Sequence, residues 1–180
     1  MSLSRLEPPG LVHLYTGDGK GKTSAAIGLS VRAAGHGIPV LFAQFLKSRD
    51  SGELTALAKL GIPVLRAKTS GKFVSQMTAG ERQEAYVQHM ELLAQVQEKM
   101  QTLPGAVVVL DEVVDAVNCG VVELNSLLEL IQTRPAATEL VLTGRNPATK
   151  LVALANYHTG FVCNAHPYQS GIAARPGIEY

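Results

Sequence analysis

A glycine-rich loop between an apolar run and an alanine-rich run constrains this chain more than any other feature. The stretch GLVHLYTGDGKGKTSAA occupies residues 10–26, with glycines at positions 17, 19 and 21 and the triplet Gly-Lys-Thr at 21–23. Glycines let the backbone bend so that successive N–H groups turn toward an anion, and the N-terminus of a following helix adds partial positive charge. The sequence therefore predicts a strand, a phosphate-binding loop and a helix here.

The side chains of this loop indicate a nucleoside triphosphate as the ligand. Lys22 would reach the phosphate chain as a point charge, and the Thr23 hydroxyl would bind a Mg²⁺ ion held by the same phosphates. The first position of the general pattern falls on Thr16 instead of glycine. The alternative is a tight turn that uses its glycines only for packing. In such a turn Lys20 and Lys22 would repel each other, because no anion would lie between them. The predicted nucleotide-binding residues are Gly17, Asp18, Gly19, Lys20, Gly21, Lys22, Thr23 and Ser24.

Acidic residues end a second apolar run, GAVVVLDE, at Asp111 and Glu112. A phosphate loop needs an acidic partner for its metal ion, and ligands of open α/β sheets collect beyond the carboxyl ends of the strands. We therefore expect Thr23, Asp111 and Glu112 to meet there with the turn Thr143-Gly144-Arg145. For the carboxylates the alternative is an exposed strand end. Arg145 fits an anion contact and an ion-paired surface arginine equally well.

Short apolar runs alternate with longer helical patterns, which predicts an α/β fold: a mostly parallel sheet with helices on both faces. The predicted strands are Leu11–Tyr15, Val40–Phe45, Pro63–Leu65, Ala106–Leu110, Glu139–Thr143 and Gly160–Cys163. Two predicted helices are Thr23–Ala34 and Leu124–Thr133. A longer helix is predicted after the capping pair Thr78 and Glu81, with an apolar stripe formed by Tyr86, Met90, Leu93 and Met100. A further helix is predicted with Asn146 as its N-cap and Pro147 as its first residue. Residues 47–76 have weak periodicity, as ligand-covering loops and ordinary connections both do.

Length and composition define the class of molecule. The 180 residues predict one domain over 11–180 after a short arm of residues 1–10, and 46% hydrophobic residues suffice for a full core. A net charge of +1 provides no field that would draw the domain to nucleic acid or to a membrane surface. We see no membrane span or signal-peptide core, and Cys119 and Cys163 lack metal-ligand spacing. A cytoplasmic protein with free thiols is expected.

Several stretches together resemble the ATP:corrinoid adenosyltransferases. They are TGDGKGKTSAAIGLSVRAAGHG (16–37), VLFAQFLK (40–47), VVVLDEV (107–113), TRPAATELVLTGRN (133–146) and GIAARPGIEY (171–180). The loop form T-G-x-G-K-G-K-T, with Thr16 first, is characteristic of that family. The resemblance implies a RecA-like P-loop NTPase fold, usually in a homodimer. It also implies transfer of the 5′-deoxyadenosyl group of ATP to the cobalt(I) of a reduced corrinoid, with release of triphosphate, in adenosylcobalamin synthesis or salvage.

Carried onto this chain, the resemblance implies that Gly17 to Thr23 hold the triphosphate, that Lys22 and Glu112 are catalytic, and that Thr23 and Glu112 bind Mg²⁺ or Mn²⁺. Cobalt(I) has no proton to lose, so the reaction needs positioning and charge stabilisation but no general base. Glu112 is then a ligand of the metal or of its water, with a base role as the alternative.

The resemblance also implies a corrinoid site and an electron donor of the flavodoxin type or another reductase. Gln44, Lys47 and Phe73 are the candidate corrinoid contacts. In some relatives a Phe and a Trp displace the lower ligand of cobalt. This chain has no tryptophan, and Phe73 stands nearest to that place, with an ordinary loop or core role as its alternative.

Other readings remain open at this stage. A small-molecule or nucleotide kinase should show an arginine-rich lid, and none is evident. A non-catalytic RecA-like ATP switch, or a module associated with nucleic acid, fits poorly with the near-zero charge and the 5% aromatic content. His13 and His89 are interpreted as structural or solvated, whereas His166 is a weak candidate for the site.

Overall fold

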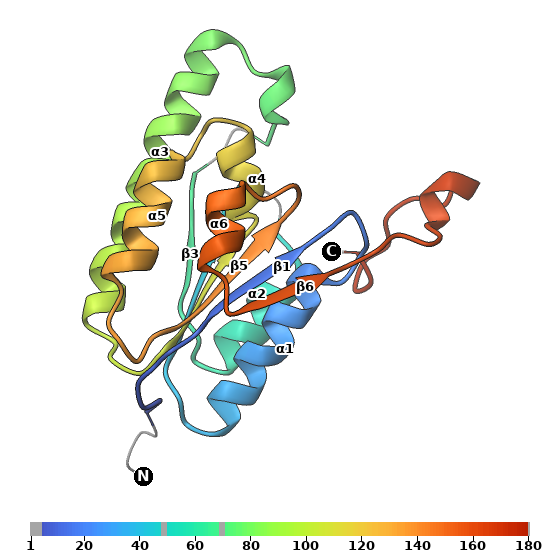
Figure 1. The fold of residues 1–180 in the computed structure, drawn as a ribbon. Coiled ribbons are helices and arrows are strands. Elements are labelled where there is room, and N and C mark those ends of the chain that lie inside the picture. The colour runs from blue at the N-terminus through green and yellow to red at the C-terminus, as the bar shows by residue number, and fades with distance from the viewer. Residues whose placement is uncertain (1–4, 48–49, 69–70, 180) are drawn as a thin grey trace.

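A parallel sheet organises the structure, a computed structural model that describes residues 5–47, 50–68 and 71–179 (Figure 1). Its six strands run in the order β3-β2-β4-β5-β1-β6, and every neighbouring pair is parallel. The predicted α/β fold with a parallel sheet is confirmed. The strands are β1 Val12–Thr16, β2 Val40–Gln44, β3 Val64–Arg66, β4 Val107–Asp111, β5 Glu139–Gly144 and β6 Tyr157–Gly160.

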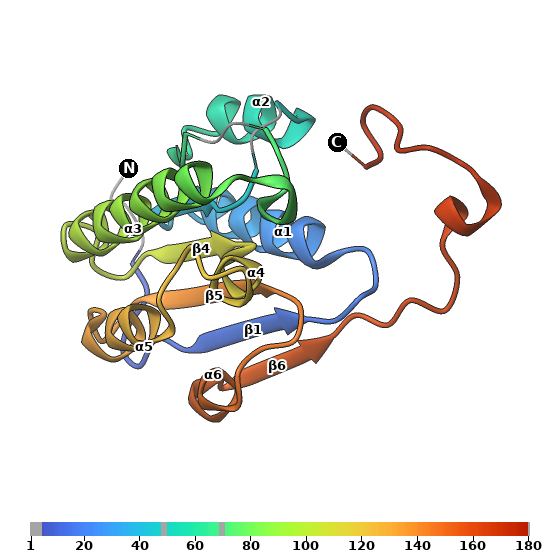
Figure 2. The same ribbon diagram turned by 90° about the horizontal axis from the view of Figure 1, so that it is seen from above.

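Helices cover both faces of the sheet, as predicted (Figure 2). The α-helices are α1 Lys22–Gly35, α2 Gly52–Lys59, α3 Ala79–Gln101, α4 Val113–Asn118, α5 Leu124–Thr133 and α6 Thr149–Leu154, and the 3₁₀ turns are Val74–Gln76 and Pro167–Ser170. Side chains alternate along a strand, so Phe42 packs with α1 and α2 while Leu41 packs with α3 to α6. All residues of β2 and β4 are buried, which explains their continuous apolar runs.

The long helix α3 confirms two sequence predictions. Thr78 is its N-cap and forms the capping box with Glu81. Leu93 and Met100 of the predicted stripe are buried in the core, and Met90 packs against it. Tyr86 is half-buried, and its hydroxyl donates a hydrogen bond to Glu123 of the segment before α5.

The last strand and the last helix differ from the prediction. The strand predicted at Gly160–Cys163 lies instead at Tyr157–Gly160, because β6 pairs with β1 and the two strands end together at Thr16 and Gly160. This edge strand is exposed, so its residues carry no apolar pattern. The predicted cap at Asn146 is also wrong, since Ala148 is the N-cap. Asn146 has a φ of 46°, a left-handed conformation that asparagine tolerates in turns.

The helices α2 and α4 had no counterpart in the prediction. The first lies in the weakly periodic stretch after β2, and the second begins directly behind Asp111 and Glu112. Of the predicted arm, residues 1–4 lie outside the described residues. Leu6 and Gly10 donate backbone hydrogen bonds to the carbonyls of Gly105 and Ala136. In the described part of the chain no helix is long and apolar enough to cross a membrane.

Candidate active site

The glycine-rich loop connects β1 to α1 and packs against the end of β6. Gly17 and Gly21 have φ values of 114° and 121°, which favour glycine. A Cβ on Gly17 would lie 2.2 Å from the carbonyl oxygen of Phe161, and the N–H of Gly19 donates to that oxygen at 2.8 Å. The glycines of this loop thus serve close packing as well as the bend that the sequence predicts.

Lys22 folds back over its own loop. Its ammonium group donates hydrogen bonds to the carbonyl oxygens of Gly17 at 2.6 Å and Gly19 at 2.9 Å. Burial lowers the pKa of Lys22, and the nearby Arg145 guanidinium lowers it further. The cation therefore stands inside the curve of the loop, where an anion bound by the loop amides would be within its reach.

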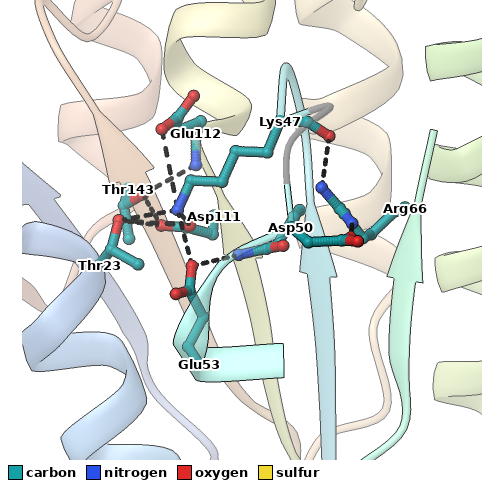
Figure 3. A network of polar contacts seen from close by, with 9 residues as sticks. Thr23, Lys47, Asp50, Glu53, Arg66, Asp111, Glu112 and Thr143 are labelled. Atoms are coloured by element: carbon teal, nitrogen blue, oxygen red, sulfur yellow. Dashed lines mark hydrogen bonds and ion pairs between the residues drawn. The ribbon is translucent and has the colours of Figure 1, made fainter. Parts of the chain in front are cut away.

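The predicted convergence at the carboxyl edge of the sheet is confirmed (Figure 3). Asp111 is fully buried at the end of β4. Its Oδ1 accepts hydrogen bonds from the hydroxyls of Thr23, at 3.0 Å, and Thr143, at 2.8 Å. Its Oδ2 accepts one from the ammonium group of Lys47 at 2.7 Å. Strands β4 and β5 and helix α1 thus place a hydroxyl of the phosphate loop directly on a buried carboxylate.

Glu112 follows in a left-handed conformation with a φ of 62°. Its N–H donates to the Thr143 hydroxyl at 2.8 Å, which fixes the turn between β4 and α4. The side chain remains 35% exposed and lines the cavity next to the loop. Burial raises the pKa of Glu112 to about 7, the neighbouring carboxylates of Asp111 and Asp115 adding to the effect and Lys47 opposing it.

The candidate corrinoid residues occupy different places. Gln44 is fully buried at the end of β2, where its amide donates to Glu53 at 3.1 Å and its Oε1 has no hydrogen-bond partner among the described residues. Lys47 points into the carboxylate cluster. Burial alone would lower the pKa of Lys47, but the ion pair with Asp111 outweighs it, so the pKa is raised. Phe73 stands apart, with 76% of its surface exposed.

Two adjoining cavities meet at the carboxylate cluster, which consists of Glu53, Asp111 and Glu112 around the Lys47 ammonium group. The first, of about 480 Å³, is lined by loop residues 18–24, Lys47, Glu112 and Arg145. The second, of about 440 Å³, has Leu46 and Phe73 in its wall. The residues that line both are Lys47, Glu53, Glu112 and Glu179. Lys47 and Phe73 therefore border the second cavity, and Gln44 lies behind it, supporting Glu53.

The chain beyond β6 turns back toward α1 and α2 and contributes to the first cavity (Figure 2). Glu179 accepts a hydrogen bond from the Lys20 ammonium group at 3.0 Å, and His166 also lines this cavity. His13 pairs with Glu139 at 2.5 Å, and the buried His89 accepts the N–H of Leu46 at 3.1 Å, so these two are structural. Sequence reasoning missed Glu53, for which no motif gave a signal, and it named Glu179 only as part of the tail stretch GIAARPGIEY without assigning it a role.

The described residues at this edge offer few ligands for a metal ion. In the ranges that the structure describes, no group of three or more His, Cys, Asp or Glu side chains is arranged to hold one. Thr23 and Asp111 offer adjacent hard oxygen atoms. Magnesium is commonly bound by one or two such groups together with phosphate oxygens and water, so the donor set fits Mg²⁺ accompanied by a nucleotide.

The glycine-rich loop between β1 and α1 carries Lys22 and Thr23, and Thr23 bonds to Asp111 of β4, with β5 lying between β1 and β4 in the sheet. This arrangement defines a P-loop nucleotide-binding protein. Solved structures agree at the level of the fold. EssC (ATPases 2 and 3) from Geobacillus thermodenitrificans aligns over 93% of this chain and 35% of its own, with a TM-score of 0.51 and 14% identity. The cytoplasmic domain of the Thermomonospora curvata type VII secretion ATPase EccC covers 85% of this chain and 21% of its own, with a TM-score of 0.51 and 15% identity.

The sequence comparisons identify the family. The family model of the ATP:corrinoid adenosyltransferases BtuR/CobO/CobP matches residues 9–180. The corrinoid adenosyltransferase of Pseudomonas aeruginosa is 30% identical over 95% of this chain and 84% of its own length. The corrinoid adenosyltransferase CobA of Salmonella typhimurium is 30% identical over 97% of this chain and 87% of its own. The chain therefore belongs to the ATP:corrinoid adenosyltransferase family and is an enzyme of that class.

Proposed function

We propose that this enzyme transfers the 5′-deoxyadenosyl group of ATP to the cobalt of a cobalt(I) corrinoid and releases triphosphate. The observation that carries the proposal is the pair of cavities with a common wall, one lined by the phosphate loop and the other bordered by Phe73. ATP in the first cavity would present its ribose C5′ to a corrinoid in the second. The cobalt electron pair forms the bond to C5′, and the C5′–oxygen bond breaks with its electrons on triphosphate.

The protein's share of this chemistry is positioning and charge stabilisation. The leaving triphosphate gains negative charge, which the loop amides and Lys22 are placed to stabilise. Lys22 donates hydrogen bonds to the carbonyl oxygens of Gly17 and Gly19. When triphosphate binds, hydrogen bonds from Lys22 to the phosphate oxygens would replace them. No proton is removed from the nucleophile, so the reaction requires no general base.

A Mg²⁺ ion, or Mn²⁺ in its place, would neutralise part of the triphosphate charge when bound. We propose that Thr23 and Asp111 hold it, because their oxygen atoms lie 3.0 Å apart and Thr23 lines the first cavity. Glu112 borders the same cavity with a partly exposed carboxylate. We assign it to the metal directly or through a water molecule.

Phe73 and Lys47 are the proposed contacts of the corrinoid. The exposed ring of Phe73 offers an apolar surface that could exclude the lower ligand of cobalt. Gln44 is fully buried, so we assign it the support of Glu53 instead of a direct contact. The resemblance to the family further supports a homodimer, a flavodoxin-type or other reductase as electron donor, a cytoplasmic location, and residues 11–180 as one catalytic unit.

Anaerobic incubation with MgATP and chemically reduced cobalamin tests the proposal. The expected products are a light-sensitive cobalt–carbon corrinoid and triphosphate in equal amounts, with no triphosphate when the corrinoid is omitted. ADP as the main product would instead indicate phosphoryl transfer, the chemistry of the kinase alternative. The Lys22→Ala variant serves as the control for contaminating activity.

A further inference from the structure

The ammonium group of Lys47 stands at the centre of the proposed metal site (Figure 3). It lies 2.7 Å from Asp111 Oδ2, 3.4 Å from Thr23 Oγ1, 3.6 Å from Glu53 Oε1 and 3.9 Å from Glu112 Oε1. A positive charge is thus surrounded by the oxygen atoms of three carboxylates and a hydroxyl. Oxygen atoms of this kind are also the ligands that a hard divalent cation prefers.

The buried Asp111 carboxylate requires a cation nearby. Its hydrogen bonds from Thr23 and Thr143 come from neutral hydroxyls, which satisfy its oxygen atoms but do not balance its charge. A buried carboxylate without a compensating charge is strongly unfavourable. Glu53 adds further negative charge at the same place, and Glu112 does so when it is ionised. Lys47, whose ammonium group lies 2.7 Å from Asp111 Oδ2, supplies this compensation.

The same lysine cannot keep this position when a metal ion binds. Magnesium coordinates oxygen at about 2.1 Å, so an ion held by Thr23 and Asp111 would occupy nearly the same space as the ammonium group. The two cations would also repel each other strongly at such a short distance. One of them has to leave.

The backbone around Lys47 is held while its side chain borders open space. Arg66 donates a hydrogen bond to the Lys47 carbonyl oxygen at 3.1 Å, and the preceding N–H, of Leu46, is bonded to the buried His89 at 3.1 Å. The side chain of Lys47 lines both cavities. Because the side chain lines both cavities, rotation about its bonds would carry the charge from Asp111 toward the cavity of Phe73.

We infer that Lys47 is the built-in counter-ion of the metal site, and that the divalent ion arriving with ATP displaces it toward the neighbouring cavity. The inference rests on the metal site of the proposed function. A positive charge would then reach the boundary of the corrinoid cavity only after metal and nucleotide have bound. Lys47 thus acts first through the occupancy of the metal site, and its proposed contact with the corrinoid follows once the ion has displaced it.

Binding of Mn²⁺ alone, followed by electron paramagnetic resonance, tests the competition in the absence of nucleotide. Lys47→Met removes the competing charge, so its affinity for Mn²⁺ should rise about tenfold or more over the unsubstituted enzyme. The matched control is Lys72→Met, which removes the same charge from the wall of the second cavity, where Lys72 pairs with Glu81, and should leave the affinity unchanged. Equal affinity in the Lys47→Met and unsubstituted proteins overturns the inference.

A crystal of the unsubstituted enzyme with Mn²⁺ and a non-hydrolysable ATP analogue gives a second test that does not depend on the folding of the variant. The expected result is anomalous signal beside Thr23 and Asp111, with the Lys47 ammonium group out of hydrogen-bond range of Asp111. A manganese ion beside an intact Lys47–Asp111 pair contradicts the displacement but leaves the proposed metal site standing. Failure of both the enzyme and Lys47→Met to bind Mn²⁺ with ATP removes the metal site itself, and the inference with it.

Discussion

Gly17 and Phe161 approach so closely that no side chain fits between them. The carbonyl oxygen of Phe161 lies 2.2 Å from the point where a Cβ on Gly17 would stand, and the φ of Gly17 is 114°. The first residue after β1 is therefore locked to the first residue after β6 by backbone contact. The shape of the phosphate loop depends on a strand from the other end of the sequence.

This contact predicts that Gly17→Ala destabilises the protein. Clash and backbone strain together should lower the free energy of unfolding by about 2 kcal/mol or more, measured by urea denaturation. Gly28→Ala is the matched control, because Gly28 lies in α1 with nothing within 4 Å of its would-be Cβ. It should raise stability by up to about 1 kcal/mol. If the two substitutions changed the free energy of unfolding equally, the loop would accommodate a Cβ at Gly17 without strain.

Lys22→Ala should impair ATP use at every corrinoid concentration. The ammonium group lies inside the loop and is assigned to the leaving triphosphate, so kcat/KM for ATP should fall by about a hundredfold or more. Steady-state triphosphate release measures the effect. Lys59→Ala, at the exposed end of α2, controls for a general loss of charge. If saturating corrinoid restored the rate of triphosphate release in Lys22→Ala, Lys22 would instead be a contact of the corrinoid.

Asp111→Asn and Glu112→Ala should separate the two acidic residues. Asp111 is buried and bonded to Thr23, so its replacement should reduce activity at all Mg²⁺ concentrations. Glu112 is partly exposed at the cavity, so Glu112→Ala should raise the Mg²⁺ concentration for half-maximal activity, by about tenfold if the contact passes through water. Rates measured over a Mg²⁺ titration test both. Unchanged metal dependence in Glu112→Ala would take that residue out of the site.

The raised pKa of Glu112, about 7, predicts a specific dependence of stability on pH. Between its ordinary value of 4.5 and about 7, the folded metal-free protein binds this proton more tightly than the unfolded chain. The contribution of Glu112 to stability is thus fully present below pH 4.5 and is lost as the pH rises through 7. Glu112→Gln removes this dependence, so its stability relative to the unsubstituted protein should rise between pH 5 and pH 8.

The size of this pH effect should be about 1 kcal/mol, less than the full shift implies, because the carboxylate is 35% exposed. Urea denaturation of the two proteins at pH 5 and pH 8, with chelator present, provides the measurement. A difference between the two proteins that stays constant over this range would place the pKa of Glu112 near its ordinary value.

Phe73→Ala should distinguish a corrinoid contact from a packing role. With 76% of its surface exposed, Phe73 contributes little to the core, so the free energy of unfolding should change by less than about 0.5 kcal/mol. The KM for corrinoid should rise about tenfold while the KM for ATP stays constant. A matching rise in both constants, or a clear loss of stability, would assign the ring to the structure of its loop.

The parts of the site that the sequence predicted have local signals. The glycine spacing of residues 17–21 and the apolar approach to Asp111 are legible from neighbouring residues alone. Strand β6 was misplaced because it is an exposed edge strand whose position is set by pairing with β1. The ion pair of Lys47 with Asp111 was not predicted, since only the order of the sheet brings the ends of β2 and β4 side by side. Contacts between distant segments leave no pattern in either one.

The bond between Lys20 and Glu179 has a practical consequence for anyone who purifies this enzyme. An affinity tag attached close behind Glu179 would lie beside the proposed ATP pocket and compete with substrate for room. The N–H of Leu6, by contrast, donates a hydrogen bond to the carbonyl oxygen of Gly105, which precedes β4. This contact lies at the opposite end of β4 from Asp111. A tag that precedes the chain is therefore the safer choice for kinetic work.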